Sequence, residues 1–175
     1  MSETMREPII IVGGGPVGAT LALLLAQKGI ATTVLEARKK AAAYTESRAL
    51  ALSFGSRKIL EKLGVWTALA PHVTAINTIH VSQKGSLGRS ILRAQDFNLA
   101  ALGYVVSYGA LSAALDEVLA NTTIVNFVFE ASAEAITYHP THATATYRQH
   151  QFSQSLSGAL VVLADGGRGL DEIAG

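Results

Sequence analysis

The chain has 175 residues, of which 49% are hydrophobic and 15% are charged, and its formal net charge at pH 7 is +1. This composition predicts a single globular domain with a buried core and excludes a disordered chain. The small net charge, with no basic stripe, argues against nucleic-acid binding, and the absence of cysteine excludes disulfides and thiolate chemistry.

The first informative segment is IIIVGGGPVGATLALLLAQKG, from Ile9 to Gly29, which carries no charge before Lys28. A membrane span or a signal peptide would be a continuous apolar helix, but three glycines and a proline interrupt the middle of this run. Four β-branched residues precede the glycines. The proline is followed by apolar residues at the spacing of one helical face: Val17, Leu21, Leu24 and Leu25. The segment therefore predicts a buried strand, a glycine turn and a helix, and a second strand ends at Glu36.

In that setting the pattern Gly13-x-Gly15-x-x-Gly18 indicates a dinucleotide site. Gly13 allows the tight turn, Gly15 lets a pyrophosphate approach the backbone, and Gly18 lets the helix pack closely on the strand. The helix N-terminus adds N–H groups and a partial positive charge. Glu36 stands where a carboxylate accepts hydrogen bonds from the ribose hydroxyls of an adenosine. The alternative is a glycine-rich turn in an ordinary α/β domain.

The residues around Glu36 bear on which dinucleotide is bound. A carboxylate at the ribose position repels a 2′-phosphate, so we expect NADP to be rejected, which leaves FAD and NAD. Arg38, Lys39 and Lys40 follow closely and could weaken this discrimination against NADP, but we interpret them as a solvated basic turn.

The rest of the chain predicts further helices and strands. Ser53 is expected to cap a helix that ends at Gly64, and a second helix is expected after Gly109. Strands at 76–82 and 89–93 predict a hairpin. Three further segments alternate between apolar and polar residues, as antiparallel strands do: 122–129, 135–138 and 144–148. A polar turn is expected after them, at 149–157. A last strand is expected at 160–163. Tyr104, Tyr108 and Tyr138 could line a pocket for an aromatic ring, but core positions are expected for them, and no metal site is predicted.

Three segments carry a family resemblance in addition to the glycine motif. They are ESRALALSFGSRKILEKLGVW (Glu46 to Trp66), LGYVVSYGALSAAL (Leu102 to Leu115) and LVVLADGGRG (Leu160 to Gly169). With them the chain resembles the flavin-dependent aromatic hydroxylases related to p-hydroxybenzoate hydroxylase. Within that family it is most similar to the ubiquinone-biosynthesis branch, the 2-octaprenyl-6-methoxyphenol hydroxylase type. The resemblance covers nearly the whole chain.

The resemblance implies an α/β fold: a Rossmann-like FAD/NAD(P)-binding domain with a parallel sheet, helices and an antiparallel β layer. It assigns the FAD pyrophosphate to Gly13, Gly15 and Gly18, and the adenosine ribose to Glu36. Arg48 matches an arginine on the flavin side of the cofactor. Asp165 and Gly166 match an Asp-Gly motif near the pyrophosphate that is linked to NAD(P)H use, although these two residues alone would indicate only a turn.

The implied function is FAD-dependent hydroxylation of the aromatic ring of a polyprenyl phenol in ubiquinone biosynthesis, with NAD(P)H and O₂. Such a substrate would bring a cytoplasmic enzyme to the inner face of the cell membrane as a peripheral protein. Apart from this small aromatic molecule, no partner is implied, and no catalytic side chain is identified. Relatives continue for roughly another domain's length. We therefore expect residues 1–175 to form a truncated FAD-binding domain that is itself inactive, with a hairpin at residues 75–95 contributing to the substrate side.

Two alternatives remain open at this point. One is an NAD-dependent dehydrogenase, although the sequence has no Tyr-x-x-x-Lys or comparable hydride-transfer pattern. The other is a catalytically inactive dinucleotide-binding fragment.

Overall fold

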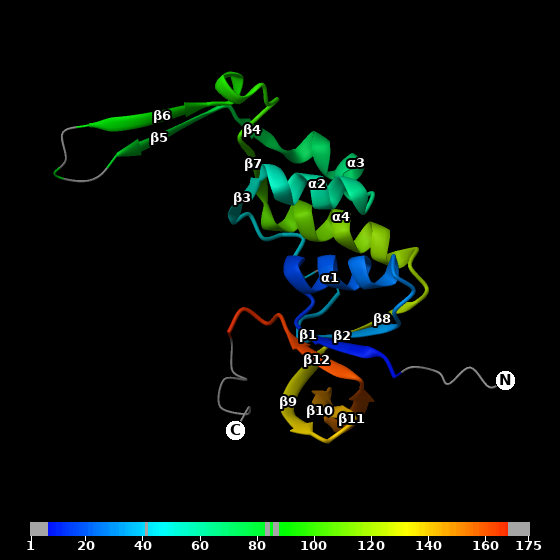
Figure 1. The fold of residues 1–175 in the computed structure, drawn as a ribbon. Helices are drawn as coiled ribbons and strands as arrows, with labels where there is room; N and C mark the ends of the chain where they lie inside the picture. Colours follow the sequence, from blue (N-terminus) through cyan, green and yellow to red (C-terminus); the bar gives the residue numbers. More distant parts are fainter. Residues whose placement is uncertain (1–6, 41, 83–84, 86–87, 168–175) are drawn as a thin grey trace. The chain divides into compact units, whose positions relative to one another are not determined.

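A computed structural model describes residues 7–40, 42–82, 85 and 88–167 (Figure 1). The described residues form two compact units, one from Met1–Ala43 with Leu115–Gly175 and the other from Tyr44–Ala114. Helix α4 (Tyr108–Ala120) contributes residues to both. Within the described part of the chain, no helix is both long enough and apolar enough to cross a membrane.

The first unit contains a four-stranded parallel sheet in the order β12–β1–β2–β8. Its strands are β1 (Ile9–Val12), β2 (Thr32–Glu36), β8 (Val125–Phe129) and β12 (Leu160–Leu163). Every residue of β2 is buried, including the polar Thr32, Thr33 and Glu36, as expected for a central strand of a parallel sheet. The predicted α/β class is confirmed. One strand was misassigned, because β8 pairs in parallel with β2 instead of joining an antiparallel layer; local alternation does not specify the partner of a strand.

Helix α1 (Pro16–Ala26) lies on one face of this sheet (Figure 1). Its buried face consists of Gly18, Ala19, Ala22 and Leu23, whereas Val17 is 72% exposed. The predicted apolar face is therefore wrong. The reason is the close approach of the helix to the turn, because a Cβ on Gly18 would overlap the carbonyl oxygen of Gly13. The helix turns its small residues toward the sheet and leaves the bulkier Val17 in solvent.

An antiparallel sheet in the order β11–β10–β9 packs on the opposite face of the parallel sheet. Its strands are β9 (Ala131–Tyr138), β10 (Ala143–Gln149) and β11 (Phe152–Gly158). The predicted polar turn at 149–157 is mostly strand β11, so that prediction is wrong. Its polar side chains pair with those of β10, as in the contact of 3.2 Å between the hydroxyls of Thr144 and Ser157. A strand facing solvent carries polar residues, and its composition resembles that of a turn.

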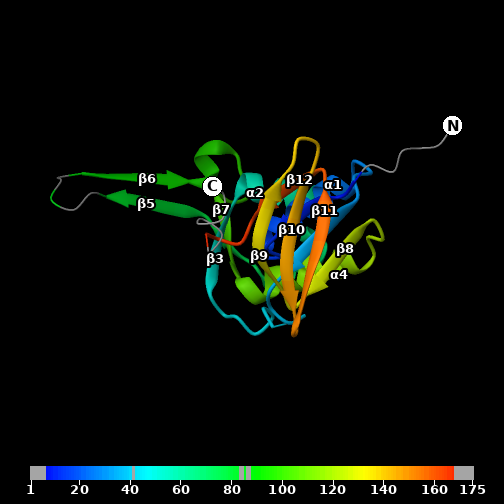
Figure 2. The ribbon, with the colours of Figure 1, turned by 90° about the horizontal axis from the view of Figure 1, so that it is seen from below.

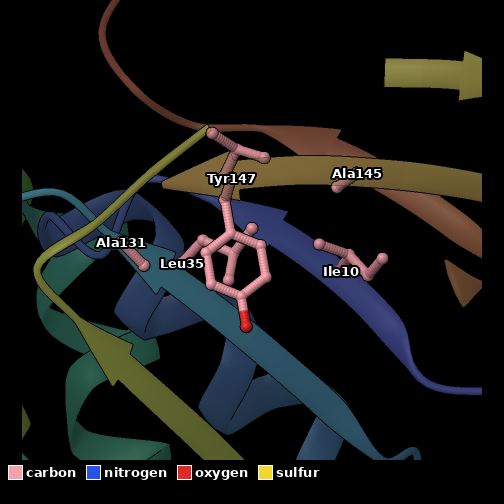
Figure 3. Packing of buried hydrophobic residues seen from close by; sticks show 6 residues of the cluster. Ile10, Leu35, Ala131, Ala145 and Tyr147 are labelled. Atoms are coloured by element: carbon pink, nitrogen blue, oxygen red, sulfur yellow. The ribbon is translucent and has the colours of Figure 1, made fainter. Parts of the chain in front are cut away.

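A hydrophobic cluster fills the space between the two sheets (Figure 3). The parallel sheet contributes Ile10, Val12 and Leu35, and the antiparallel sheet contributes Ala131, Ala145 and Tyr147. The ring of Tyr147 reaches from β10 toward Leu35, and its hydroxyl donates to Gln154 Oε1 at 2.9 Å. The small side chains of Ala131 and Ala145 leave room for this ring in the cluster.

The second unit contains a three-stranded antiparallel sheet in the order β3–β7–β4. Its elements are β3 (Ala49–Ser53), α2 (Phe54–Lys62), α3 (Trp66–Leu69), η1 (Ala70–His72), β4 (Thr74–Ile76), η2 (Ala94–Phe97) and β7 (Gly103–Ser107). The predicted cap of α2 is confirmed, because Ser53 Oγ accepts a hydrogen bond from the Ser56 N–H at 3.0 Å.

Two paired strands stand where the sequence predicts a hairpin (Figure 2). They are β5 (Thr78–Ser82) and β6 (Arg89–Arg93), and residues 83–84 and 86–87 of their connection lie outside the described residues. The contribution of this hairpin to a substrate side stays a prediction.

An aromatic and charged cluster joins α2, α3 and β7. Arg57 donates to the Tyr104 hydroxyl and, from Nε, to Glu61 Oε1 at 2.7 Å. The rings of Trp66 and Tyr104 meet edge to face, with their centroids 4.9 Å apart. Tyr104 is buried as expected, and so is Tyr108, but the prediction for Tyr138 is wrong because that side chain is 60% exposed at the end of β9.

We predict that Gly18→Ala destabilises the protein by about 1–3 kcal/mol, because the added methyl group would force α1 away from the Gly13 carbonyl oxygen. Denaturant unfolding without ligand measures this change. The matched control is Gly55→Ala in α2, whose Cβ would meet only Ser53 Oγ at 3.6 Å. It should be neutral or stabilising by up to about 1 kcal/mol. A Gly18→Ala protein as stable as the original would contradict the close-approach argument.

Candidate nucleotide-binding site

The turn between β1 and α1 is held against the ends of two neighbouring strands. Gly13 has a backbone φ of +101°, which residues with a side chain rarely adopt. Its N–H donates to the Leu35 carbonyl at 2.8 Å. A Cβ on Gly13 would lie 2.5 Å from the carbonyl oxygen of Ala164, directly after β12. Both the conformation and the space therefore require glycine here. The turn lies at the carboxyl edge of the parallel sheet, where α/β folds bind ligands.

Gly14 connects this turn to the predicted ribose carboxylate. Its N–H donates to Glu36 Oε2 at 2.8 Å. A Cβ on Gly14 would overlap the ring of Phe127 and lie 2.9 Å from the Cβ of Glu36. The turn can therefore approach the end of β2 only because this residue has no side chain.

Gly15 is the N-cap of α1 and has extended backbone angles. It forms no side-chain cap, and Pro16 fills the first turn, where its missing N–H costs nothing. In the described structure, the start of this eleven-residue helix is thus left without a capping side chain. Exposed N–H groups and the helix dipole suit a phosphate at this end.

Glu36, at the end of β2, is a buried residue that is only 7% exposed. Burial acts to raise the pKa of Glu36, but hydrogen bonds from the side chain and backbone of Arg38, the charge of Arg38 and the Gly14 N–H outweigh it, so the pKa lies below its ordinary value. The group is therefore an anion at neutral pH and can act only as a hydrogen-bond acceptor.

Arg38 corrects the prediction of a solvated basic turn. Its Nε donates to Glu36 Oε1 at 2.8 Å and its Nη2 to Glu36 Oε2 at 3.3 Å, while its backbone N–H donates to Oε1 at 2.9 Å. Lys39 and Lys40 are exposed, in line with the prediction for them. The error arose because the sequence shows a run of three cations but not which of them turns back to the carboxylate.

Asp165 and Gly166 follow β12 and lie beside the glycine turn. The Ala164 N–H donates to the Val12 carbonyl at 2.7 Å, which aligns the two chain segments. A Cβ on Gly13 would lie 2.7 Å from the Asp165 nitrogen. Asp165 Oδ1 accepts from the Gly167 N–H at 3.0 Å, and Gly166 has a φ of +76°. This is the turn that the Asp-Gly pair alone indicates, and its cofactor role stays a prediction.

Arg48 belongs to the second unit, whereas the other predicted site residues belong to the first. Its side chain is 56% exposed, and its Nε lies 3.0 Å from Glu46 Oε1. Its guanidinium carbon lies 4.7 Å from the centre of the Tyr108 ring, a cation–π geometry. The cation is therefore held in place on its own unit, and its contact with a flavin stays a prediction.

Sequence reasoning missed three contributors: Gly14, Phe127 and Arg38. Gly14 lies between the glycines of the motif and is not one of them. Phe127 lies on β8, whose parallel pairing with β2 the sequence does not predict. Arg38 is one of three consecutive cations after Glu36, and the sequence alone does not distinguish it from Lys39 and Lys40.

The geometry of the first unit fits the adenosine diphosphate part of a dinucleotide. It offers a buried anionic acceptor, an uncapped helix N-terminus and a turn without Cβ atoms, and β1, β2 and β12 bring these features to one edge. A 2′-phosphate on the ribose, as in NADP, would be repelled by the Glu36 carboxylate, because both groups are negatively charged.

Comparison with known proteins identifies the family of the chain. Residues 6–172 match the family model described as FAD binding domain. The chain is 30% identical over 164 residues to the ubiquinone hydroxylase UbiL of Rhodospirillum rubrum, covering 91% of this chain and 37% of that protein. It is 29% identical over 173 residues to the kynurenine 3-monooxygenase of Dictyostelium discoideum, covering 95% of this chain and 35% of that protein. The chain thus spans little more than a third of the length of these relatives.

The fold is also shared with solved structures. The p-nitrophenol 4-monooxygenase PnpA of Pseudomonas putida aligns with a TM-score of 0.80 at 21% identity, over 97% of this chain and 44% of that one. At this identity the likeness shows the fold alone. The family match extends over nearly the whole chain and includes the glycine turn, Glu36 and the Asp-Gly turn. The chain therefore belongs to the FAD binding domain family.

Proposed function

We propose that this chain is the nucleotide-binding part of an FAD-dependent monooxygenase that hydroxylates an aromatic ring. The observation that carries the proposal is the buried, ionised Glu36 bonded to the glycine turn, in a chain that matches the FAD-binding family. The named relatives are hydroxylases or monooxygenases of different aromatic molecules, so ring hydroxylation is the activity that they share.

The roles of the residues follow from their positions. Glu36 accepts from the ribose hydroxyls of FAD, and the turn from Gly13 to Gly15, with the start of α1, receives the pyrophosphate. When bound, FAD supplies the redox chemistry that activates O₂, with NAD(P)H as the electron donor. The role that this proposal gives to Gly13, Gly15 and Glu36 is to hold and orient this cofactor.

For the substrate we propose a polyprenyl phenol of ubiquinone biosynthesis. The support is the resemblance of the glycine, Arg48 and Asp165 segments to that branch, together with the similarity to the ubiquinone hydroxylase. A polyprenyl chain partitions into lipid, so the enzyme would work as a peripheral protein on the cytoplasmic face of the membrane.

The function is tested by titrating the purified protein with FAD and following flavin fluorescence and absorbance. NAD(P)H oxidation is then measured with and without a short-chain prenyl phenol, and the hydroxylated product is identified by mass spectrometry. FAD binding is expected of residues 1–175, and phenol-dependent oxidation with product is expected when these residues are part of a protein of their relatives' length. Binding of NAD in preference to FAD would favour a dehydrogenase, and FAD binding without turnover in that longer protein would favour a catalytically inactive dinucleotide-binding protein.

We predict that Glu36→Gln weakens FAD binding about ten- to a hundredfold, because a charged acceptor is lost and an amide N–H₂ is placed among N–H donors. Isothermal titration calorimetry measures the affinity. The matched control is Glu134→Gln on β9, whose carboxylate is also paired with an arginine, at 2.6 Å from Arg148 Nε. Equal affinities for the two variants would remove Glu36 from the site.

We further predict that Gly15→Val abolishes FAD binding and leaves the protein folded, because a branched side chain would occupy the place of the pyrophosphate. Circular dichroism reports folding, and the flavin absorbance of the purified protein reports binding. The same substitution at Gly55, in the first turn of α2, should leave FAD binding unchanged. A yellow Gly15→Val protein would show that the phosphates lie elsewhere.

A further inference from the structure

The Glu36 carboxylate already has a full set of hydrogen-bond donors. An ionised carboxylate has about four acceptor positions. Four N–H groups occupy them: Arg38 N and Arg38 Nε on Oε1, and Gly14 N and Arg38 Nη2 on Oε2. A ribose that is to bind here must therefore replace one or more of these donors.

The four donors differ in how easily they can leave. Gly14 N and Arg38 N belong to the backbone of the turn and of the β2 end, so moving them would disrupt the edge of the sheet. Nε and Nη2 belong to the Arg38 side chain, which is 39% exposed and can change its conformation without moving the backbone. The longest of the four bonds, at 3.3 Å, is from Nη2. The guanidinium is thus the replaceable donor.

The guanidinium also has the shape of the group that would replace it. It presents two N–H donors side by side, one to each carboxylate oxygen. The ribose of an adenosine presents two neighbouring O–H donors, which can be received by the same two oxygens.

We propose that Arg38 acts as an internal competitor that occupies the ribose-binding positions of Glu36 until the two hydroxyls of the nucleotide displace it. The proposal rests on the proposed function, because it needs Glu36 to be the ribose acceptor. It goes further by making Arg38 a residue that sets nucleotide affinity. Each nucleotide that binds must break the ion pair of Arg38 with Glu36, so the free energy of that pair reduces the free energy of binding.

The test uses ADP and 2′,3′-dideoxy-ADP, which differ only in the two hydroxyls, and needs no flavin. We expect Arg38→Ala to strengthen ADP binding about two- to fivefold, the range for a partly exposed ion pair. Binding of the dideoxy analogue should be unchanged, because that ligand does not displace the guanidinium. The control Arg148→Ala, which breaks the comparable pair with Glu134, should change neither affinity.

Arg38→Lys provides a second variant that keeps the charge but lacks the two-donor fork, and it should give a smaller gain in ADP affinity. An unchanged ratio of ADP to dideoxy-ADP affinity in both variants would overturn the proposal. Weaker ADP binding by folded variants would also overturn it, and would make Arg38 a support for Glu36. If the unmodified protein binds neither ADP nor FAD, the proposed function itself fails, which is a distinguishable result.

Discussion

The Glu36 carboxylate accepts the Gly14 N–H at 2.8 Å, and this bond ties the end of β2 to the turn between β1 and α1. Two backbone bonds support it from either side, from Gly13 N to the Leu35 carbonyl and from Ala164 N to the Val12 carbonyl. The carboxyl ends of three parallel strands are therefore locked at one edge. The position of every candidate cofactor residue in the first unit depends on this arrangement, because each lies on one of these strand ends or on the turn.

Close backbone approach is the constraint that makes this edge possible. Added Cβ atoms would collide with a carbonyl at Gly13 and Gly18 and with the Phe127 ring at Gly14, so three glycines are fixed by packing before any ligand is considered. The two sheets then meet around Tyr147, which gives β2 its second buried face. Folding and nucleotide recognition thus use the same glycines, and a substitution there has to be tested for stability and for binding separately.

The parts that the sequence predicted well are those determined by local chemistry: the β1–turn–α1–β2 order, the Ser53 cap and the Asp165-Gly166 turn. The failures depended on partners distant in sequence. The direction of β8 is set by its pairing with β2, the buried face of α1 by its distance from Gly13, and the strand β11 by its pairing with β10. Of the candidate site, the residue types were predictable, but the contacts of Glu36 with Gly14 and Arg38 required the fold.

Arg38 shows why a residue near a binding carboxylate is hard to interpret from its charge alone. Without ligand, burial of Glu36 disfavours the anion, and the Arg38 and backbone donors offset that cost. A ribose diol offers neutral donors, so it can replace the hydrogen bonds of the guanidinium but not its charge. The anion in the bound state must then rely more on the Gly14 and Arg38 backbone N–H groups, which stay in place in either state. Backbone donors therefore orient the carboxylate in both states, and the side-chain donor determines how much of its bonding capacity is left for the nucleotide.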